Sequence, residues 1–327
     1  MRKQKMKKIL SLLAAGVLLL MSMSGCGKEA ETGKTQVAMI VKSTESAFFK
    51  SVFAGARAAA TEYNLNVTFN GPESEEDYVT QNEMVRQAME DGVDVIVFSA
   101  VDYNANAEII GQAAQRGIKI VVIDSDVNSS MVSCRIGTNN LQAGVKAAEA
   151  ALAVGEDELY IGIVNYDVNS ANGQQRELGF RQTVEQDPRV KDITTINVLS
   201  TTEDARAGAK EMLLSDSRIN VVVTFNEWTS LGVGWAIRDL DRGARTQVVA
   251  FDSNVVSVGM LETGEVDALI VQNPYAMGYL GVETAANLIN GQTGGPSVID
   301  TATTIVTREN MYERESQKIL FSFEERK

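Results

Sequence analysis

Residues 91–126, DGVDVIVFSAVDYNANAEIIGQAAQRGIKIVVIDSD, contain one complete strand–helix–strand unit. The runs Val93–Phe98 and Ile118–Ile123 are rich in β-branched residues and apolar at consecutive positions, which is typical of strands buried on both faces. Residues 105–116 have helical periodicity, and Gly117 follows them as a helix-exit residue. A buried strand, a helix and a second buried strand in this order predict parallel strands of one sheet.

The same alternation continues on both sides of this unit, from Gln36 to about residue 290. Further strands are predicted at Val37–Val41, Val67–Phe69, Tyr160–Val164, Thr195–Leu199, Val221–Phe225, Val248–Phe251 and Ala268–Val271, and further helices at 48–64, 78–91, 141–153, 173–186, 203–215, 228–240, 254–263 and 275–290. This number of strand–helix units is larger than one small doubly wound sheet contains. We therefore predict an α/β protein with two doubly wound parallel-sheet lobes, the second of which starts near Tyr160.

The composition is that of a globular protein and excludes several kinds of chemistry. The chain has 327 residues, of which 44% are hydrophobic and 22% charged, and this length allows two domains of ordinary size. It has no His and 2 Cys, which excludes His-dependent nucleophile systems, His-ligated metals and thiolate zinc cages. The net charge of −13 argues against nucleic-acid binding, since phosphate contacts need clustered Lys and Arg. We predict no cofactor and no metal site.

The first 25 residues are predicted to be a targeting segment. A basic head at residues 2–8 precedes the apolar run Ile9–Met23, which is short for a membrane span. The sequence Met23-Ser24-Gly25-Cys26 resembles the lipobox of bacterial lipoproteins. That resemblance implies cleavage after residue 25 and lipidation of Cys26, with an uncleaved anchor helix as the alternative.

Cleavage would leave a strongly acidic protein on a lipid anchor. Residues 1–25 contain five Lys or Arg and no Asp or Glu, so their removal changes the formal net charge from −13 to −18. We expect anionic lipid heads to repel such a surface, so that the acyl chains alone hold the protein at the membrane. Residues 26–35 are predicted to be a polar, flexible tether. Cys134 would be the remaining thiol, and we expect it to be a buried structural residue of a strand.

Polar and aromatic residues follow the predicted strands, and open parallel sheets bind ligands beyond these strand ends. They are Lys42–Ser46, Phe48, Phe49, Ser99, Asp102, Asp124–Asp126, Asn165–Asp167, Asn226–Trp228, Asp252, Gln272 and Asn273. Carboxylates and amides bind the hydroxyl groups of neutral sugars, and aromatic rings pack against their C–H faces. The residues with this combination are Asp124, Asn226, Asp252 and Gln272, with Phe48, Phe49 and Trp228. Each taken alone could instead be a helix cap or a packing residue.

Two other kinds of ligand site are disfavoured. No Gly-rich phosphate-binding loop follows the first predicted strand, and the chain has no Walker-type motif. The acidic run Glu73–Asp77 lacks the spaced oxygen ligands and the turn Gly of a calcium loop. We interpret it as a solvated loop that leads into a helix.

From about Gln36 to Val306 the chain resembles the ribose/galactose-type periplasmic binding proteins, the substrate-binding subunits of sugar ABC importers, which have the periplasmic binding protein-like I fold. The matching landmarks are Ser46-Ala47-Phe48-Phe49, where the family has an Asn-Pro-Phe-Phe-like segment, Gly92–Phe98, Gly117–Asp124, Asn226, Val249–Asp252 and Val271–Pro274. The resemblance implies ligand contacts from Phe48 and Phe49, from the hydroxyl-binding Asp124, Asn226, Asp252 and Gln272, and from Lys42, Ser46 and Ser99.

The chain departs from the family at two arginines. Ser125 and Gln174 occupy positions where family members often carry Arg, and Arg176 lies two residues after the second. The loss of two guanidinium groups removes bidentate hydrogen bonding that Lys42 does not replace in geometry. We include Gln174 among the ligand-binding positions, and we expect another monosaccharide or polyol rather than ribose.

The family also implies two lobes joined by three crossing segments. The crossings are expected near Asn139–Asn140, Gln272–Asn273 and Asp300–Thr303. The N-terminal lobe would comprise residues 36–139 and 273–300, and the C-terminal lobe residues 140–272 and 301–327. The ligand would bind between the lobes, and hinge closure would bury it.

We therefore expect a monomeric, lipid-anchored, extracytoplasmic protein of a bacterial cell membrane that delivers a monosaccharide or related polyol to an ABC permease and catalyses no reaction. A sugar sensor acting with a membrane kinase or chemoreceptor would have the same binding residues and is the alternative. A sugar-responsive repressor would need a basic helix-turn-helix segment where this chain has a secretion signal. The missing His and Gly-x-Ser-x-Gly elbow disfavour a hydrolase, whereas a glycosidase with a carboxylate pair remains chemically possible.

Overall fold

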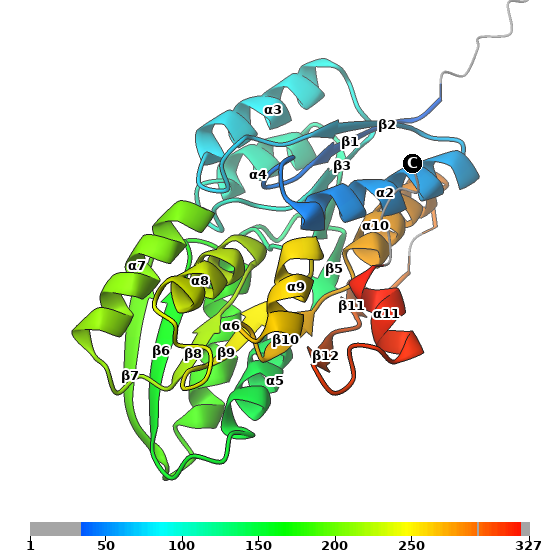
Figure 1. Cartoon of the computed structure of the whole chain (residues 1–327). Coiled ribbons are helices and arrows are strands. Elements are labelled where there is room, and N and C mark those ends of the chain that lie inside the picture. The colour runs from blue at the N-terminus through cyan, green and yellow to red at the C-terminus, as the bar shows by residue number, and fades with distance from the viewer. Residues whose placement is uncertain (1–33, 293, 322–327) are drawn as a thin grey trace, which may run out of the picture. The chain divides into compact units, whose positions relative to one another are not determined.

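The computed structural model describes residues 34–292 and 294–321 (Figure 1). The predicted signal peptide, the lipidation site Cys26 and most of the predicted tether lie outside these residues. The described residues from Thr35 onward belong to one compact unit. Among the described helices, none is long and apolar enough to cross a membrane.

A six-stranded sheet forms the centre of the first lobe. Its order is β11 (Val298–Thr301), β5 (Cys134–Thr138), β4 (Lys119–Ile123), β3 (Val95–Phe98), β1 (Gln36–Ile40) and β2 (Asn66–Asn70). All of its neighbouring strands are parallel. Helices α2 (Ala47–Glu62) and α10 (Pro274–Ile289) pack on one face, and α3 (Tyr78–Glu90) and α4 (Ala107–Gln115) pack on the other. Every residue of β3 is buried, as expected of a central strand.

A second six-stranded sheet repeats this arrangement in the second lobe. Its order is β12 (Thr304–Thr307), β10 (Ala268–Val271), β9 (Gln247–Phe251), β8 (Val221–Thr224), β6 (Leu159–Asn165) and β7 (Val190–Asn197). Only the pair of β12 and β10 is antiparallel among the pairs described. Helices α5 (Asn140–Leu152) and α6 (Ala171–Val184) pack on one face, and α7 (Thr202–Ser215), α8 (Glu227–Asp239), α9 (Val255–Thr263) and α11 (Arg314–Leu320) belong to the other.

Each lobe contains a helix that follows a strand of the other lobe. Strand β5 of the first sheet leads into α5, which packs against α6, and β10 of the second sheet leads into α10, which packs against α2. Glycines allow both pairs to approach closely. A Cβ added at Gly278 would lie 1.9 Å from a backbone oxygen of α2, and one added at Gly144 would lie 2.0 Å from a backbone oxygen of α6. The two lobes therefore match in topology and in this helix pair.

The chain crosses between the lobes three times in its described part. The crossings run from β5 to α5, from β10 to α10 and from β11 to β12. They lie at the positions that the family resemblance implies, so the predicted fold of two doubly wound lobes joined by three segments is confirmed.

The differences from the predicted elements lie at the edges of the sheets. Strand β7 begins and ends before the predicted Thr195–Leu199, because this edge strand is only partly buried and mixes polar with apolar residues. Strands β11 and β12 were not predicted, because they are edge strands that are only partly buried and lack the continuous apolar run of equally short strands such as β3. Helix α11 was not predicted either, since its seven residues are too few to show a helical period. Cys134, the first residue of β5, is a buried free thiol as expected.

Candidate functional site

A small cavity, here called the inner cavity, lies where residues following the strand ends of both lobes meet. It has a volume of about 20 Å³ and is lined by Lys42, Ser46, Phe48, Phe49, Glu75, Asp124, Tyr166, Asn172, Arg176, Asn226, Glu227, Asp252 and Gln272. The fold therefore brings together most of the sequence-predicted site residues, although these are spread along most of the chain. The remaining three predicted residues lie outside the lining.

Two of these three are close to the inner cavity. Ser99 lies behind Asp124, and its hydroxyl donates a hydrogen bond to Asp124 Oδ2 at 2.9 Å. Trp228 lines a neighbouring cavity, and its indole N–H donates to Glu75 Oε1 at 3.3 Å. Both residues therefore support side chains of the lining.

The third, Gln174, is exposed on α6 and is not among the residues that line the inner cavity. Arg176 lines it instead. Residues two positions apart on a helix point in directions about 200° apart, so only one of the two can face the site. Alignment to the family placed the polar group at Gln174, and the mostly polar sequence of α6 has too little apolar periodicity to indicate Arg176 instead.

The prediction of a solvated acidic loop is wrong for Glu75, which is only 9% exposed. Its carboxylate accepts a hydrogen bond from Ser200 Oγ at 3.1 Å and lies 3.5 Å from Lys42 Nζ. A carboxylate leaves water only where donors and cations replace its hydration. These partners come from distant parts of the chain, so nothing in the acidic run itself distinguishes Glu75 from its exposed neighbour Glu73.

Two aspartates occupy equivalent places in the two lobes. Asp124 directly follows β4, and Asp252 directly follows β9. Both have left-handed backbones, with φ of 55° for Asp124 and 68° for Asp252, a conformation that Asp and Asn tolerate better than most residues. Strained residues of this kind concentrate at functional sites, because the surrounding structure must hold them in place. The fold thus points one carboxylate from each lobe into the inner cavity.

Arg176 organises the side chains of the second lobe. It is 1% exposed and makes hydrogen bonds from Nε to Asn140 Oδ1 at 2.8 Å, from Nη1 to the Phe225 carbonyl at 2.6 Å and from Nη2 to Gln272 Oε1 at 2.7 Å. Its guanidinium also lies 4.8 Å from the centre of the Phe251 ring. Arg176 therefore fixes Gln272 in one orientation, with its amide nitrogen turned away from the guanidinium.

That amide nitrogen meets the second aspartate. Gln272 Nε2 donates to Asp252 Oδ1 at 2.7 Å. Burial raises the pKa of Asp252 to about 7, although the charge of Arg176 and the Gln272 hydrogen bond both act to lower it, while Glu227 and Asp124 raise it further. Asp252 can therefore donate or accept a hydrogen bond near neutral pH, depending on its protonation state.

This pKa predicts a pH dependence of stability. The pKa of Asp252 rises from 3.8 to about 7 on folding, so between these pH values the folded chain binds more protons than the unfolded chain. The stability that the protonated carboxyl group contributes is therefore lost as the pH rises from about 4 to about 7. We expect the free energy of unfolding in urea to fall between pH 5 and pH 7 more steeply for the wild type than for Asp252→Asn, by about 1 kcal/mol per pH unit. Parallel pH profiles for the two proteins would contradict this assignment.

Hydrogen bonds join the two lobes around the inner cavity. Lys42 Nζ, from the end of β1, donates to Ser170 Oγ at 2.9 Å. Asn172 Nδ2, from the start of α6, donates to Asp124 Oδ1 at 3.2 Å. The negative charges nearby, first Glu75, hold the pKa of Lys42 above its ordinary value although burial opposes this, so the amine is charged. The polar groups of the site are thus satisfied by one another across the lobes.

Glu227 makes a further contact between the lobes. Its carboxylate, at the start of α8, accepts hydrogen bonds from the backbone N–H groups of Ala47 at 3.2 Å and Phe48 at 3.1 Å. These groups lie in the first turn of α2, where no intrahelical acceptor exists and where the helix dipole favours negative charge. Asn254 Nδ2 donates to the same carboxylate at 2.9 Å. Glu227 therefore stabilises the arrangement in which the lobes enclose the site, even though burial raises its pKa.

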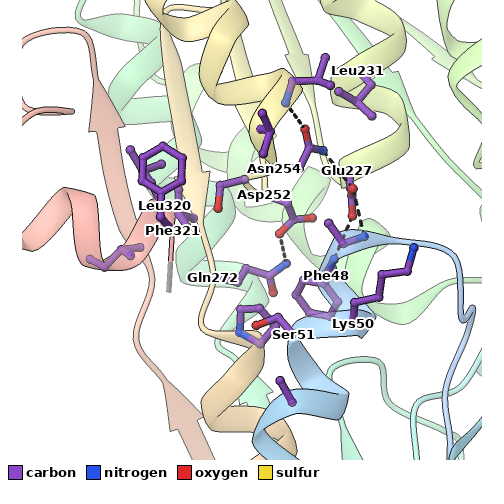
Figure 2. Close-up of a pocket in the computed structure, with 18 of the residues that line it drawn as sticks. Phe48, Lys50, Ser51, Glu227, Leu231, Asp252, Asn254, Gln272, Leu320 and Phe321 are labelled. Atoms are coloured by element: carbon purple, nitrogen blue, oxygen red, sulfur yellow. Dashed lines mark hydrogen bonds between the residues drawn. The ribbon is translucent and has the colours of Figure 1, made fainter. Parts of the chain in front are cut away.

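A larger cavity, here called the outer cavity, adjoins the inner one and has a volume of about 680 Å³ (Figure 2). The two share Phe48, Glu227, Asp252 and Gln272. In the described part of the chain, no group of three or more acidic or Cys side chains could hold a metal ion. The site can therefore be described as a polar inner cavity beside a wider outer one, with four lining residues in common.

Comparison with known proteins supports one family. The model of the periplasmic binding protein domain family matches residues 37–293. The D-ribose/D-allose-binding protein of Pseudomonas aeruginosa is 27% identical over 321 residues, which cover 92% of this chain and 99% of that protein.

Solved structures agree with this result. A carbohydrate transporter solute binding protein from Agrobacterium radiobacter, solved in complex with D-arabinose, is 26% identical with a TM-score of 0.85, over 88% of this chain and 99% of that one. A sugar transporter from Clostridium phytofermentans is 30% identical with a TM-score of 0.76, over 84% of this chain and 100% of that one. The shared fold spans both lobes.

Proposed function

Because this chain belongs to the periplasmic binding protein family, we propose that it captures a monosaccharide or a related polyol between its two lobes and delivers it to the permease of an ABC importer. It binds and releases its ligand without catalysing a reaction on it. The relatives named above are binding and transport proteins, and those whose ligands are given bind ribose, allose or arabinose.

The meeting of carboxylates, amides and aromatic rings in one cavity is the observation that carries this proposal. Asp124 and Asp252 can each accept hydrogen bonds from two hydroxyl groups, and the amide side chains beside them can donate and accept at once. Phe48 and Phe49 pack edge to face with ring centres 5.1 Å apart and bring apolar surface to the same cavity. C–H faces of a sugar ring pack well on such surface.

The charges of the inner cavity favour a neutral ligand. Its two cations face carboxylates of the protein, since Lys42 Nζ lies 3.5 Å from Glu75 and Arg176 acts electrostatically on Asp252. An anionic ligand would have to compete with these carboxylates for the cations. A polyhydroxylated neutral ligand can instead accept from the cations and donate to the carboxylates.

Entry of the ligand requires movement of the lobes. A cavity of about 20 Å³ has room for about one water molecule, and a monosaccharide is several times larger. We infer that the lobes, taken as residues 36–139 with 273–300 and residues 140–272 with 301–327, open and close about the three crossings. The ligand then replaces the hydrogen bonds that join the lobes, and it favours the closed state by its higher affinity for it.

A thermal-shift screen of monosaccharides and polyols tests the proposal. A ligand that binds only the folded state raises the unfolding midpoint, and the rise grows with ligand concentration. We expect an increase that continues to grow with the logarithm of concentration for at least one neutral pentose, hexose or polyol, and none with dicarboxylates or nucleotides. A screen in which only charged ligands raise the midpoint would refute the proposed class.

We also propose that the protein is held at the outer face of a bacterial cell membrane by acyl chains on Cys26. The lipobox-like sequence before this Cys supports the anchor, and the acidic surface makes an electrostatic membrane contact unfavourable. The polar segment 26–35 would keep the lobes clear of the lipid.

Replacement of the anchor residue gives a direct measurement. In cells fed a labelled fatty acid, we expect the wild type and Cys134→Ser to incorporate the label and Cys26→Ser to incorporate none. Equal labelling of the wild type and Cys26→Ser would disprove lipidation at this residue.

A further inference from the structure

The outer cavity shares part of its wall with the site proposed to bind the sugar. Asp252 and Gln272, joined by a hydrogen bond of 2.7 Å, line both cavities, as do Phe48 and Glu227 (Figure 2). The lobe opening that admits a sugar would also separate these residues, so a ligand bound at them could extend from the inner cavity into the outer one. The outer cavity is of ordinary size for a small-molecule site, for which about 300–1,000 Å³ is usual.

The outer cavity differs from the inner one in chemistry. Its walls include Trp228 and Leu231 of α8, Val255 and Val256 of α9, and Leu320 and Phe321 at the end of α11. Val255, Val256 and Phe321 are exposed by 65%, 44% and 39%, which is high for apolar side chains. Exposed apolar residues gathered around one concavity indicate a binding surface. A hydroxyl-rich ring would gain little from these walls.

The charged residues of the outer cavity already have partners within the protein. Lys50 Nζ donates to the Glu45 carbonyl at 2.8 Å, and the Arg57 guanidinium lies 4.7 Å from the centre of the Phe69 ring. The shared wall holds Glu227, Asp252 and Gln272, and beyond it the lining is mostly apolar. Ser51 Oγ is the exception among the described lining residues, since it is buried and has no hydrogen-bond partner there. This order suits a ligand with a polar head and an apolar extension.

We propose that the natural ligand is a glycoside with an aromatic aglycone, whose sugar occupies the inner cavity and whose aglycone occupies the outer cavity. The inference rests on the proposed function, since it assigns the sugar to the inner cavity. An aromatic ring is the extension that gains most here, because it buries a large apolar area at low conformational cost and can contact Trp228 and Phe48.

Matched glycoside pairs test this inference. Binding of the methyl and 4-nitrophenyl β-glycosides of D-glucose, D-galactose and D-xylose, and of the α-glycosides of L-arabinose, is measured by titration calorimetry beside the free sugars. Within each pair, only the aglycone differs. For the sugars that bind, we expect the 4-nitrophenyl glycoside to bind about tenfold or more tightly than the methyl glycoside.

Two variants locate the effect. Leu231→Trp and Val256→Trp place a large side chain in the outer cavity, and we expect each to reduce the ratio of the two affinities to about one. Val79→Trp is the matched control, since Val79 is an exposed valine on α3 that lines neither cavity, and we expect it to keep the wild-type ratio.

The outcomes separate the two proposals. If free sugars bind but 4-nitrophenyl glycosides bind no better than methyl glycosides, or are rejected, the inference is overturned and the proposed function stands. A preference that persists in both tryptophan variants also overturns it, because the aglycone then lies elsewhere. If neither sugars nor glycosides bind, the proposed function itself fails.

Discussion

Asp124→Ala is expected to abolish the rise in unfolding midpoint that a bound sugar produces, and to weaken binding by at least about 100-fold. A carboxylate that accepts hydrogen bonds from two hydroxyl groups loses both when it is truncated, and each contributes about 1.5–3 kcal/mol. Asp252→Ala removes the equivalent carboxylate of the second lobe, and we expect a similar loss. Titration calorimetry with the best sugar of the thermal-shift screen measures both effects.

These variants need a control that shows the effect of backbone strain alone. Asp124 and Asp252 have positive φ, so Ala strains the chain at either position whatever the ligand does. Asp241 also has a positive φ, of 50°, but it is exposed and lies outside both cavities. We expect Asp241→Ala to lower stability slightly and to bind sugar like the wild type. Unchanged binding by both Asp124→Ala and Asp252→Ala would show that the ligand lies somewhere else.

The largest effect on stability is expected at Arg176. Its removal takes a donor from Asn140 Oδ1 and from the Phe225 carbonyl, and it leaves Gln272 Oε1 with the Thr138 hydroxyl alone. It also leaves the buried Asp252 carboxylate without the positive charge of Arg176. Loss of one partner from a buried polar group of this kind costs about 3–5 kcal/mol. We expect Arg176→Ala to lower the free energy of unfolding by this amount, measured by urea denaturation.

Two further variants show whether the loss of stability in Arg176→Ala comes from the hydrogen bonds of the buried guanidinium group. Arg181 lies on the same helix, but its side chain is 30% exposed and pairs with Glu177, so Arg181→Ala should cost less than about 1 kcal/mol. Arg176→Lys keeps the charge and loses the three-way hydrogen bonding, and we expect an intermediate loss in a protein that still folds. Equal stabilities for the wild type and Arg176→Lys would show that the geometry of the guanidinium is not needed.

The regular part of the fold could be predicted because it depends on local pattern. Buried parallel strands such as β3 and β4 are apolar at nearly every position, and the helices between them end at glycines. The same rule places Asp124 after β4 of the first sheet and Asp252 after β9 of the second. Their proximity depends in addition on how the two lobes face each other, which the strand pattern does not show. Edge strands such as β7 and β11 have one face partly in water, and their sequences carry much less of this pattern.

The rest of the site depends on contacts between distant residues. Glu75 is buried because Lys42 and Ser200 offer it a cation and a hydroxyl, and neither lies near it in the sequence. The choice between Gln174 and Arg176 depends on how α6 is rotated about its axis, and an error of two residues reverses the direction. Both features are properties of packing, and a single sequence shows them only after the fold is known.

The exchange of α5 and α10 between the lobes also constrains the order of folding during synthesis. One face of the first sheet is covered in part by α10, whose last residue is Ile289, so the emerging N-terminal half cannot complete its own core while the ribosome is still translating the second lobe. Completion of the first lobe therefore has to wait until nearly the whole second lobe has been synthesised, and the two halves become stable together rather than one after the other.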